Sequence, residues 1–273
     1  MGELTKYQSL KNMLSAESTK KRFEEMLGSK ANGFISSVLQ VVNNSEYLKN
    51  ADPSSIMTSA AIAASLDLPI NPNLGYSALI PYNDKQRGQI CQFQIMTRGF
   101  NQLAIRSGQY LAINNAIVYE GQLIKQDPFK GEYVFDFNAK KSDKVIGYVG
   151  YFRLVNGFEK YLYMTVDEVE KHGRKYSQTY RKGYGNWKDD FDGMALKTVL
   201  KLLLSKYGYL SIELQKAVTF DQSTVVSNSD DATNIEDVEI VYSDNVEESQ
   251  SEKVKHLLHG GIDNGWTKKY WMA

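Results

Sequence analysis

Apolar positions near the start of the chain follow the spacing of helices. Between residues 34 and 42 they recur every three or four positions, which is the period of one helix face, so residues 1–50 are expected to be helical. Asp52 and Pro53 predict the start of a further helix over 54–66, because Asp can cap a helix and Pro suits its first turn. Two prolines shortly afterwards predict its end, since proline cannot continue a helix.

The middle of the chain alternates between apolar and polar positions, as strands with one buried face do. Residues 76–82 and 90–95 flank a polar turn and predict a hairpin. The dipeptide Asn156-Gly157 is a strong signal for a second hairpin with a two-residue turn. Further strands are predicted over 109–120, 133–137, 145–155 and 158–164.

Helices are interleaved with these strands. One is predicted over 97–107, and a long helix over 189–207 is expected to end at the glycine that follows it. Between them, Thr165 is followed three residues later by Glu168, which is the capping-box pattern and predicts a helix over 166–172. The pattern therefore predicts helices and hairpins in alternation.

Composition divides the chain near residue 220. The formal net charge is zero, but residues 221–273 carry eleven acidic and four basic side chains, and residues 1–220 carry 28 basic and 21 acidic ones. A basic body with an acidic tail suggests binding of a polyanion, although a solvated tail on an ordinary domain accounts for the charges equally well. The acidic stretch is rich in Ser and Asn and is expected to be a disordered linker.

Missing motifs disfavour several kinds of chemistry. The sequence has no G-x-x-x-x-G-K-[ST] loop, which disfavours an ATP-driven recombinase or helicase. Cys91 is the only cysteine, so no disulfide can form within the chain, and it is expected to be a core residue. Because no apolar stretch is long enough to span a bilayer and the N-terminus does not resemble a signal peptide, a cytoplasmic protein is expected.

Two groups of residues are candidates for holding a metal ion. Asp189, Asp190 and Asp192 form an acidic cluster of the kind that a two-metal nuclease would need. They also begin a predicted helix, where the helix dipole favours negative charge, so helix capping is the favoured interpretation. His256 and His259 lack the further ligands that a zinc site needs.

Basic and aromatic residues point more strongly to nucleic acid. Residues 171–188 contain no acid, and their glycines would let the backbone follow a strand closely. Cations neutralise phosphates, and flat rings stack on unpaired bases. The same composition also fits a solvated flexible loop. The cations are Lys171, Arg174, Lys175, Arg181, Lys182 and Lys188, and the rings are those of His172, Tyr176, Tyr180, Tyr184 and Trp187.

Two predicted helices add polar stripes. Arg98, Gln102 and Arg106 lie four residues apart and therefore share one helix face. Because an arginine can hold two phosphate oxygens at once, this stripe suits contact with a phosphate backbone. Lys197 and Lys201 lie one turn apart on the narrow polar edge of a later helix. They would meet either a bound anion or an internal carboxylate, and the sequence leaves both open.

Four segments carry a likeness to a known family: Ser55–Tyr82, Gln94–Tyr110, Val145–Lys160 and Trp187–Gly208. Together and in this order they resemble the RecT/Redβ family of phage single-strand DNA annealing proteins, and its RecT branch in particular. The likeness is close to the proteins of Listeria-type temperate phages and covers roughly residues 30–215. The run Leu-Pro-Ile-Asn-Pro-Asn-Leu-Gly-Tyr is its most specific part.

The resemblance implies a fold and a function. The fold is α+β, with a curved antiparallel β-sheet and packed helices related to annealing proteins of the Rad52 type. Residues 1–50 would form a helical oligomerisation region, 51–220 the DNA-binding annealing core, and 221–273 an acidic disordered linker and small tail. Such a protein is not an enzyme: it binds single-stranded DNA in a basic groove and pairs it with a complementary strand, without ATP, in homologous recombination.

The resemblance also implies partners. These are single-stranded DNA, the annealed duplex intermediate, further copies of the chain in a ring or helical filament, a phage 5′→3′ exonuclease and the host single-strand-binding protein. The setting is the host bacterial cytoplasm, with no membrane contact. No cofactor is expected, and Mg²⁺ would act only by modulating DNA binding. A metal-dependent nuclease, a passive single-strand-binding protein and a structural assembly protein are the alternatives.

Roles follow for the candidate residues. Lys85 and Arg87, at the tip of the first hairpin, are assigned to the second strand or a neighbouring subunit. Tyr76 and Trp187 are candidates for stacking on bases or for a wedge between them. A steep loss of affinity with salt is expected, because each neutralised phosphate adds about −0.7 to −0.9 to the slope of log K against log salt. Backbone contact is assigned to Arg98, Gln102, Arg106, Arg153, Lys171, Arg174, Lys175, Arg181, Lys182, Lys188, Lys197 and Lys201.

Overall fold

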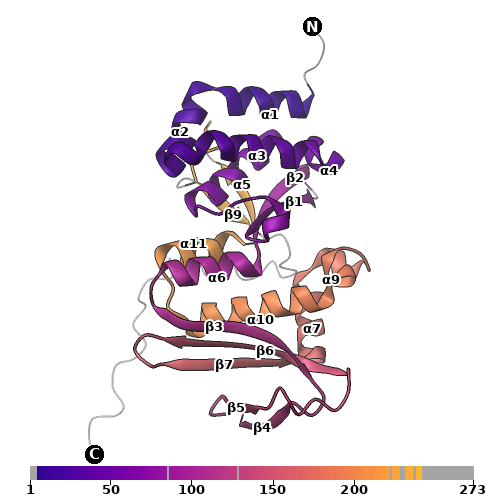
Figure 1. Cartoon of the computed structure of the whole chain (residues 1–273). Coiled ribbons are helices and arrows are strands. Elements are labelled where there is room, and N and C mark those ends of the chain that lie inside the picture. Colours follow the sequence, from indigo (N-terminus) through magenta and orange to yellow (C-terminus); the bar gives the residue numbers. More distant parts are fainter. Residues whose placement is uncertain are drawn as a thin grey trace, which may run out of the picture. The chain divides into compact units, whose positions relative to one another are not determined.

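Helices and antiparallel strands are combined in the described part of the chain (Figure 1). The strand pairs there are all antiparallel, so the expected α+β class is confirmed. None of the described helices is long and apolar enough to cross a membrane. The computed structural model describes residues 5–84, 86–127, 129–221, 223–227, 231–235 and 238–241, all within the unit Met1–Ser243.

The N-terminal region is helical, as expected. Asp52 caps helix α5 by accepting a hydrogen bond from the N–H of Ser55, and Pro53 is the first helical residue, so the predicted start is confirmed. Helix α5 is buried almost all round because its small side chains let other elements approach closely. The helices are α1 (Lys6–Ser15), α2 (Glu17–Leu27), α3 (Ala31–Asn43), α4 (Glu46–Lys49) and α5 (Pro53–Ser65), with a 3-10 turn, η1 (Gly28–Lys30).

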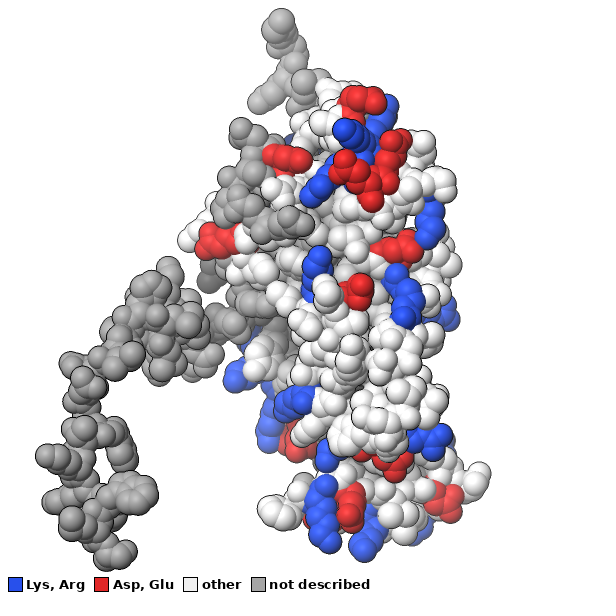
Figure 2. Space-filling view, turned by 90° about the vertical axis from the view of Figure 1, so that its left-hand side faces the viewer, with Lys and Arg blue, Asp and Glu red and all other residues white. Residues whose placement is uncertain are grey.

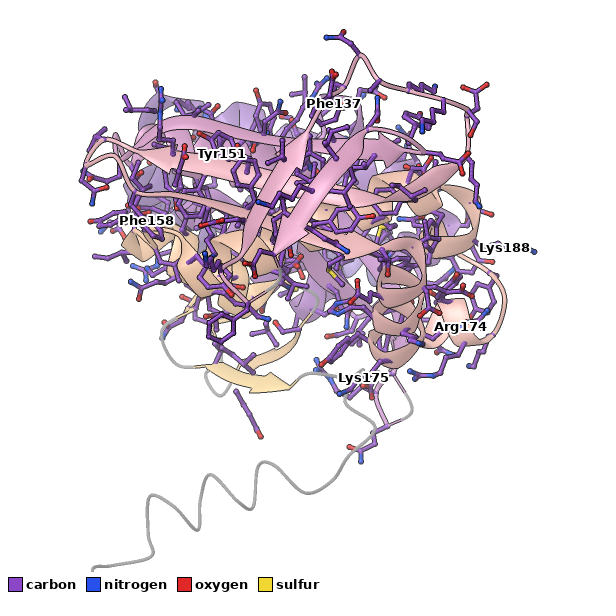
Figure 3. All side chains as sticks on the ribbon, turned by 90° about the horizontal axis from the view of Figure 1, so that it is seen from below. Phe137, Tyr151, Phe158, Arg174, Lys175 and Lys188 are labelled. Carbon is purple, nitrogen blue, oxygen red and sulfur yellow. The ribbon has the colours of Figure 1, made fainter. Side chains whose placement is uncertain are left out.

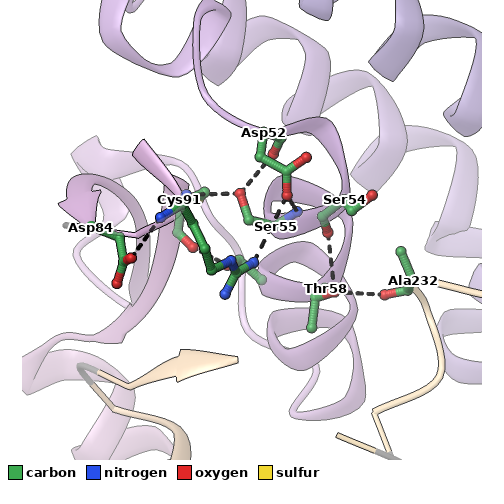
Figure 4. Close-up of polar contacts among 9 residues, drawn as sticks. Asp52, Ser54, Ser55, Thr58, Asp84, Cys91 and Ala232 are labelled. Carbon is green, nitrogen blue, oxygen red and sulfur yellow. Dashed lines mark hydrogen bonds and ion pairs between the residues drawn. The ribbon is translucent and has the colours of Figure 1, made fainter. Parts of the chain in front are cut away.

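The first predicted hairpin is confirmed as β1 (Ser77–Asp84) and β2 (Gly88–Ile95), which follow a second 3-10 turn, η2 (Pro72–Leu74). Hydrogen bonds fasten it to α5 (Figure 4): the N–H of Cys91 donates to Oγ of Ser55 at 2.9 Å. Thr58 donates in turn to the carbonyl of Ala232 at 2.9 Å. Burial raises the pKa of the Cys91 thiol to about 12, so this thiol stays protonated and is a core group, as expected.

A second sheet has the strand order β3-β6-β7. Its inner face carries Tyr148 and Phe152, which are buried against the helices. Gly157 has a φ of 87° and forms the predicted turn between β6 and β7. Register shifts at both ends of β3 are bulges, which bend a strand. The strands are β3 (Tyr110–Tyr119), β6 (Val145–Leu154) and β7 (Glu159–Thr165), with a separate hairpin of β4 (Leu123–Asp127) and β5 (Glu132–Phe135).

Helix α10 lies between the β3-β6-β7 sheet and α6. It packs on β6 and β7 from one side and contacts α6 on the other, an arrangement visible in Figure 1. The predicted capping box is confirmed, since Thr165 and Glu168 each accept a hydrogen bond from the other's backbone N–H. The remaining helices are α6 (Thr97–Arg106), α7 (Val166–Tyr176), α8 (Gln178–Arg181), α9 (Asn186–Asp189), α10 (Phe191–Tyr207) and α11 (Ile212–Phe220).

Ordered structure continues into the segment that composition assigns to the acidic linker. Strands β8 (Thr224–Ser227) and β9 (Val238–Val241) pair there, and Val225 and Ala232 belong to the main core. The rest of the predicted linker and tail, including 242–273, lies outside the described residues. The division of the chain at residues 50 and 220 stays a prediction.

Candidate nucleic-acid interface

Helix α6 presents the predicted stripe of polar residues. Phe100, Leu103 and Ala104 are fully buried, which leaves Arg98 and Arg106 on the exposed side. Each arginine is anchored by one backbone carbonyl. Nη1 of Arg98 donates to the carbonyl of residue 74 at 3.2 Å, and Nη2 of Arg106 donates to that of residue 66 at 2.7 Å. Because a guanidinium has five N–H donors, donors remain on both groups.

The segment between α5 and β1 meets this face at a conformationally unusual residue. Asp67 has a φ of 47°. Among the non-glycine residues in the described part of the chain, it alone has a positive φ. It ends α5 where glycine is usual, and Asp is among the few residues that tolerate the left-handed region. Its carboxylate lies 2.8 Å from Nζ of Lys30 and 3.9 Å from Nη1 of Arg106. Asp67 therefore links α6 to the turn before α3.

A cavity of about 470 Å³ opens beside α6. Tyr76 and Gln102, both predicted DNA contacts, line it together with residues of α3 and of the segment before β1. Gly99 allows α6 to lie close to the backbone of Tyr76, because a Cβ at position 99 would overlap the carbonyl oxygen of Tyr76. Tyr76 and Gln102 thus share one cavity, and Arg98 and Arg106 contact residues that line it, Leu74 and Asp67.

The hairpin tip is only partly described. Lys85 lies outside the described residues. Arg87 is exposed, and its Nη2 lies 3.9 Å from the carboxylate of Asp52 at the start of α5. Asp84 accepts hydrogen bonds from the N–H groups of Gln86 and Arg87 at 2.9 Å, which shapes the turn. Contact of Lys85 and Arg87 with a second strand or subunit stays a prediction.

Half of the cations in the basic loop are held by protein groups. Lys171 pairs with Asp167 at 2.6 Å, and Arg174 pairs with Glu170 at 2.7 Å, both one turn apart on α7. Nη1 of Arg181 donates to the carbonyls of residues 174 and 175, so it satisfies the C-terminal end of α7.

The other three cations of the loop are exposed. Lys182 and Lys188 have no hydrogen bond or ion pair with the described residues, and Lys175 lies 5.2 Å from the ring centre of Tyr176. Figure 3 shows Arg174, Lys175 and Lys188 pointing outward from the region of α7 to α9. The ammonium groups of these three lysines are therefore the cations of the loop that are available to bind an anion.

Lys197 and Lys201 lie beside an internal carboxylate. Asp221 is fully buried and lies 3.3 Å from Nζ of Lys197 and 2.6 Å from Nζ of Lys201. Burial, which outweighs the attraction of Asp221, lowers the pKa of Lys197 to about 8. Burial alone would raise the pKa of Asp221, but the two lysines lower it. With Lys197 only 4% exposed, the internal pair is the arrangement found, and phosphate contact by these lysines stays a prediction.

Trp187 is 6% exposed and belongs to a cluster of buried residues. Its ring stacks on Tyr180 with a centroid distance of 5.5 Å and meets Phe191 edge-on at 5.7 Å. A Cβ at Gly173 would come within 2.9 Å of the indole, so the glycine makes room for it. In this arrangement protein groups surround the ring of Trp187. Stacking of a base on Trp187 stays a prediction.

The outer face of the β3-β6-β7 sheet carries aromatic residues that the sequence analysis missed. Tyr151 and Tyr161 lie on neighbouring strands with ring centroids 4.6 Å apart, and the exposed Arg153 shares their face. Figure 3 shows Tyr151 on the sheet face turned to the viewer. The sequence could have revealed this face, because side chains alternate along the strand β6 and residues 151 and 153 therefore lie on one side. The hydroxyl of Tyr151 donates to Glu159 at 2.7 Å.

Two of the three aspartates at the start of α10 have local partners for their side chains. Asp190 accepts a hydrogen bond from the N–H of Gly193 at 3.0 Å, so the expected capping is confirmed for it. The hydroxyl of Tyr148 donates to Asp192. In the part of the chain that the structure describes, no three His, Cys, Asp or Glu side chains are grouped to hold a metal ion. His256 and His259 lie outside that part.

Comparison with known proteins gives a consistent family match. The model of the RecT family matches residues 32–253, a range that includes all four motif segments. The chain is 44% identical over 249 residues to Uncharacterized protein YqaK of Bacillus subtilis (strain 168), covering 90% of this chain and 84% of that protein. It is 30% identical over 184 residues to Protein RecT of Escherichia coli (strain K12), covering 64% and 65% respectively.

Proposed function

The chain belongs to the RecT family, which implies annealing of single-stranded DNA in recombination, and we propose that it does so without ATP from a basic surface centred on α6. One observation carries this proposal. Two anchored guanidinium groups flank Gln102 on one exposed helix face, within the stretch that the family model matches. Annealing requires that two phosphate backbones be screened while base edges stay free, and arginines beside a strand meet that requirement.

The proposed surface extends beyond α6 through the free cations of the basic loop. Lys175, Lys182 and Lys188 supply further phosphate contacts. On the face shown in Figure 2, Lys and Arg are interspersed with Asp and Glu, so a continuous basic track is not expected there. Sequence is then read by base pairing and not by the protein.

Family membership implies oligomerisation, and we propose that the oligomer is a ring or helical filament on DNA. The proposed setting is the bacterial cytoplasm, beside a 5′→3′ exonuclease that exposes the strand and a host single-strand-binding protein. The proposed protein is not an enzyme and uses no cofactor, and Mg²⁺ modulates its DNA binding.

The direct test mixes two complementary oligonucleotides, one carrying a fluorophore and the other a quencher, with the full chain and no nucleotide. The proposal predicts faster quenching than the strands show alone. Slower pairing with tight binding would instead mark a passive single-strand-binding protein. Shortening of the labelled strand in the presence of Mg²⁺ would mark a nuclease.

A further inference from the structure

The cavity beside α6 has a volume and a lining that suit a flat aromatic ring. Its volume of about 470 Å³ falls within the range of roughly 300–1,000 Å³ that is common for small-molecule sites. The rings of Phe34 and Tyr76 line it together with the aliphatic side chains of Leu68, Ile70 and Leu74. Leu68 and Ile70 are almost fully buried behind it, so its floor is fixed by the core.

The cavity also holds a polar group without a partner. The carboxamide of Gln102 lines it and makes no hydrogen bond with the described residues. A carboxamide can donate two hydrogen bonds and accept two, which matches the mixed edge of a nucleobase. The hydroxyl of Ser37 donates to the carbonyl of residue 33 and can still accept. A cavity lined by both apolar and polar side chains suits a heterocycle better than an aliphatic chain.

Charges at the rim favour a ligand that carries phosphates. Arg98 and Arg106 are eight residues apart, so about 12 Å of helix separates them, and each is anchored to a carbonyl at one side of the cavity. Lys30 adds a third cation. Asp67 faces Lys30 and Arg106, and Glu213 is a second acid near Arg106. The balance at the rim is positive. The left-handed backbone of Asp67 agrees with such a role, because strained residues cluster at binding sites.

From these contacts we propose that the cavity is a nucleobase subsite. It takes one unpaired base of the bound single strand, between the rings of Phe34 and Tyr76 and against the Gln102 amide. Arg98 and Arg106 hold phosphates of the same strand next to that nucleotide. The inference rests on the proposed function, since it presupposes a bound single strand. It adds that the cavity holds the base of one nucleotide.

The subsite has a consequence for annealing. A base inside the cavity cannot pair, so it must leave when the complementary strand arrives. The base is therefore held in the single-strand complex and released in the duplex complex. The subsite fixes the register of the first strand on the protein without selecting a sequence.

The experiment uses two matched variants of α3. Ser37 lines the cavity and Ser36 does not, yet each is a helical serine whose hydroxyl donates to the carbonyl four residues earlier at 2.9 Å. Ser37→Phe would fill the cavity, and Ser36→Phe makes the same change beside it. The full chain is bound to an oligonucleotide of 5-iodouracil, irradiated, and the crosslinked residues are mapped by mass spectrometry. Affinity for oligo(dT) is measured on the same samples.

The proposal predicts crosslinks to Tyr76 or Phe34 in the wild type and in Ser36→Phe, with at least tenfold less in Ser37→Phe. Adding the complementary strand should also remove them. Affinity for oligo(dT) should fall about 5- to 150-fold in Ser37→Phe alone, which is the effect of losing one stacked base. Gln102→Leu, which keeps the cavity open, should retain the crosslink and weaken binding less.

Two results would overturn the subsite. In the first, the wild type binds DNA in a salt-sensitive way but crosslinks only at residues other than Tyr76 and Phe34. That result would refute the subsite and leave the proposed function unaffected. The other is a change of oligomeric state in Ser37→Phe with crosslinks unchanged, which would show that a second copy of the chain fills the cavity. Failure of the wild type to bind any oligonucleotide would refute the proposed function itself.

Discussion

Helices α6 and α10 each carry a pair of cations that the sequence analysis assigned to DNA, yet the structure uses the two pairs differently. Arg98 and Arg106 on α6 are exposed and touch only backbone carbonyls and the rim carboxylate of Asp67. Lys197 and Lys201 on α10 share the buried carboxylate of Asp221. Spacing along a helix therefore does not reveal whether a cation serves a ligand or the core. The burial of the carboxylate decides it, since Asp67 is half exposed and Asp221 is not exposed at all.

The difference has energetic meaning. Exposed arginines can exchange a weak local partner for a phosphate at little cost, because surface pairs contribute only about 0–1 kcal/mol. A buried pair adds little net stability, but removing one partner leaves an uncompensated buried charge. We therefore expect changes on α6 to affect DNA binding and changes around Asp221 to affect folding.

The largest effect is expected from Asp221→Asn. It leaves Lys197 buried without a carboxylate, so the free energy of unfolding should fall by about 3–5 kcal/mol, as measured by urea denaturation. Asp143→Asn is the control, because Asp143 also pairs with a lysine but its side chain is 98% exposed. Equal stability of the two variants would mean that the α10 lysines do not depend on Asp221.

The next effect concerns the salt dependence of DNA binding. Replacing both Arg98 and Arg106 with Ala should reduce the slope of log K against log salt by about 1.4, at roughly 0.7 for each single-strand phosphate that is no longer neutralised. Unfolding free energy should change by less than about 1 kcal/mol, because both side chains lie at the surface. A slope identical to that of the wild type would remove α6 from the interface.

A pH effect is expected at His172, which is close enough to lysines of α10 to be affected by their charge. Burial, together with Lys201, Lys175 and Lys206, lowers the pKa of His172 to about 4. The folded state then binds fewer protons than the unfolded state between pH 6.5 and 4, so stability is full above pH 6.5 and falls as the pH drops. Between pH 7 and pH 4.5, the free energy of unfolding should fall less in His172→Gln than in the wild type. The difference should be on the order of 1 kcal/mol, because the ring is only partly buried. Parallel losses in both proteins would contradict this environment.

The smallest effect separates cations within the basic loop. Lys188→Ala should lower the salt slope by about 0.7, since Lys188 is free of described partners. Lys171→Ala should change it less, because Lys171 already pairs with Asp167. Stability should change by no more than about 0.5 kcal/mol in either variant, which thermal unfolding would check. A larger slope change for Lys171 would reverse the order of the loop contacts.

Local signals predicted much of the fold. Asp52 with Pro53, and Thr165 with Glu168, mark helix starts because a cap needs only residues a few positions apart. The turn at Gly157 was predictable for the same reason, since glycine readily adopts the positive φ that it shows there. The shared face of Arg98, Gln102 and Arg106 follows directly from the helical period.

Contacts between distant segments could not be predicted in this way. Trp187 lies in a region of basic and polar composition, and only the fold shows that Tyr180, Phe191 and Gly173 enclose it. Val225 joins the core from a segment whose overall composition is acidic. The cavity beside α6 likewise needs α3 and residues 66–76 to meet, which no local pattern encodes.

The most direct test of the α6 surface is the annealing rate of two charge-reversal variants without ATP. One is Arg98→Glu with Arg106→Glu. The other is Lys130→Glu with Lys144→Glu, which makes the same change in net charge at exposed residues with no assigned role. We predict at least a tenfold loss of annealing rate in the arginine variant and less than a twofold loss in the lysine variant. Equal losses, or wild-type annealing by the arginine variant, would contradict the account.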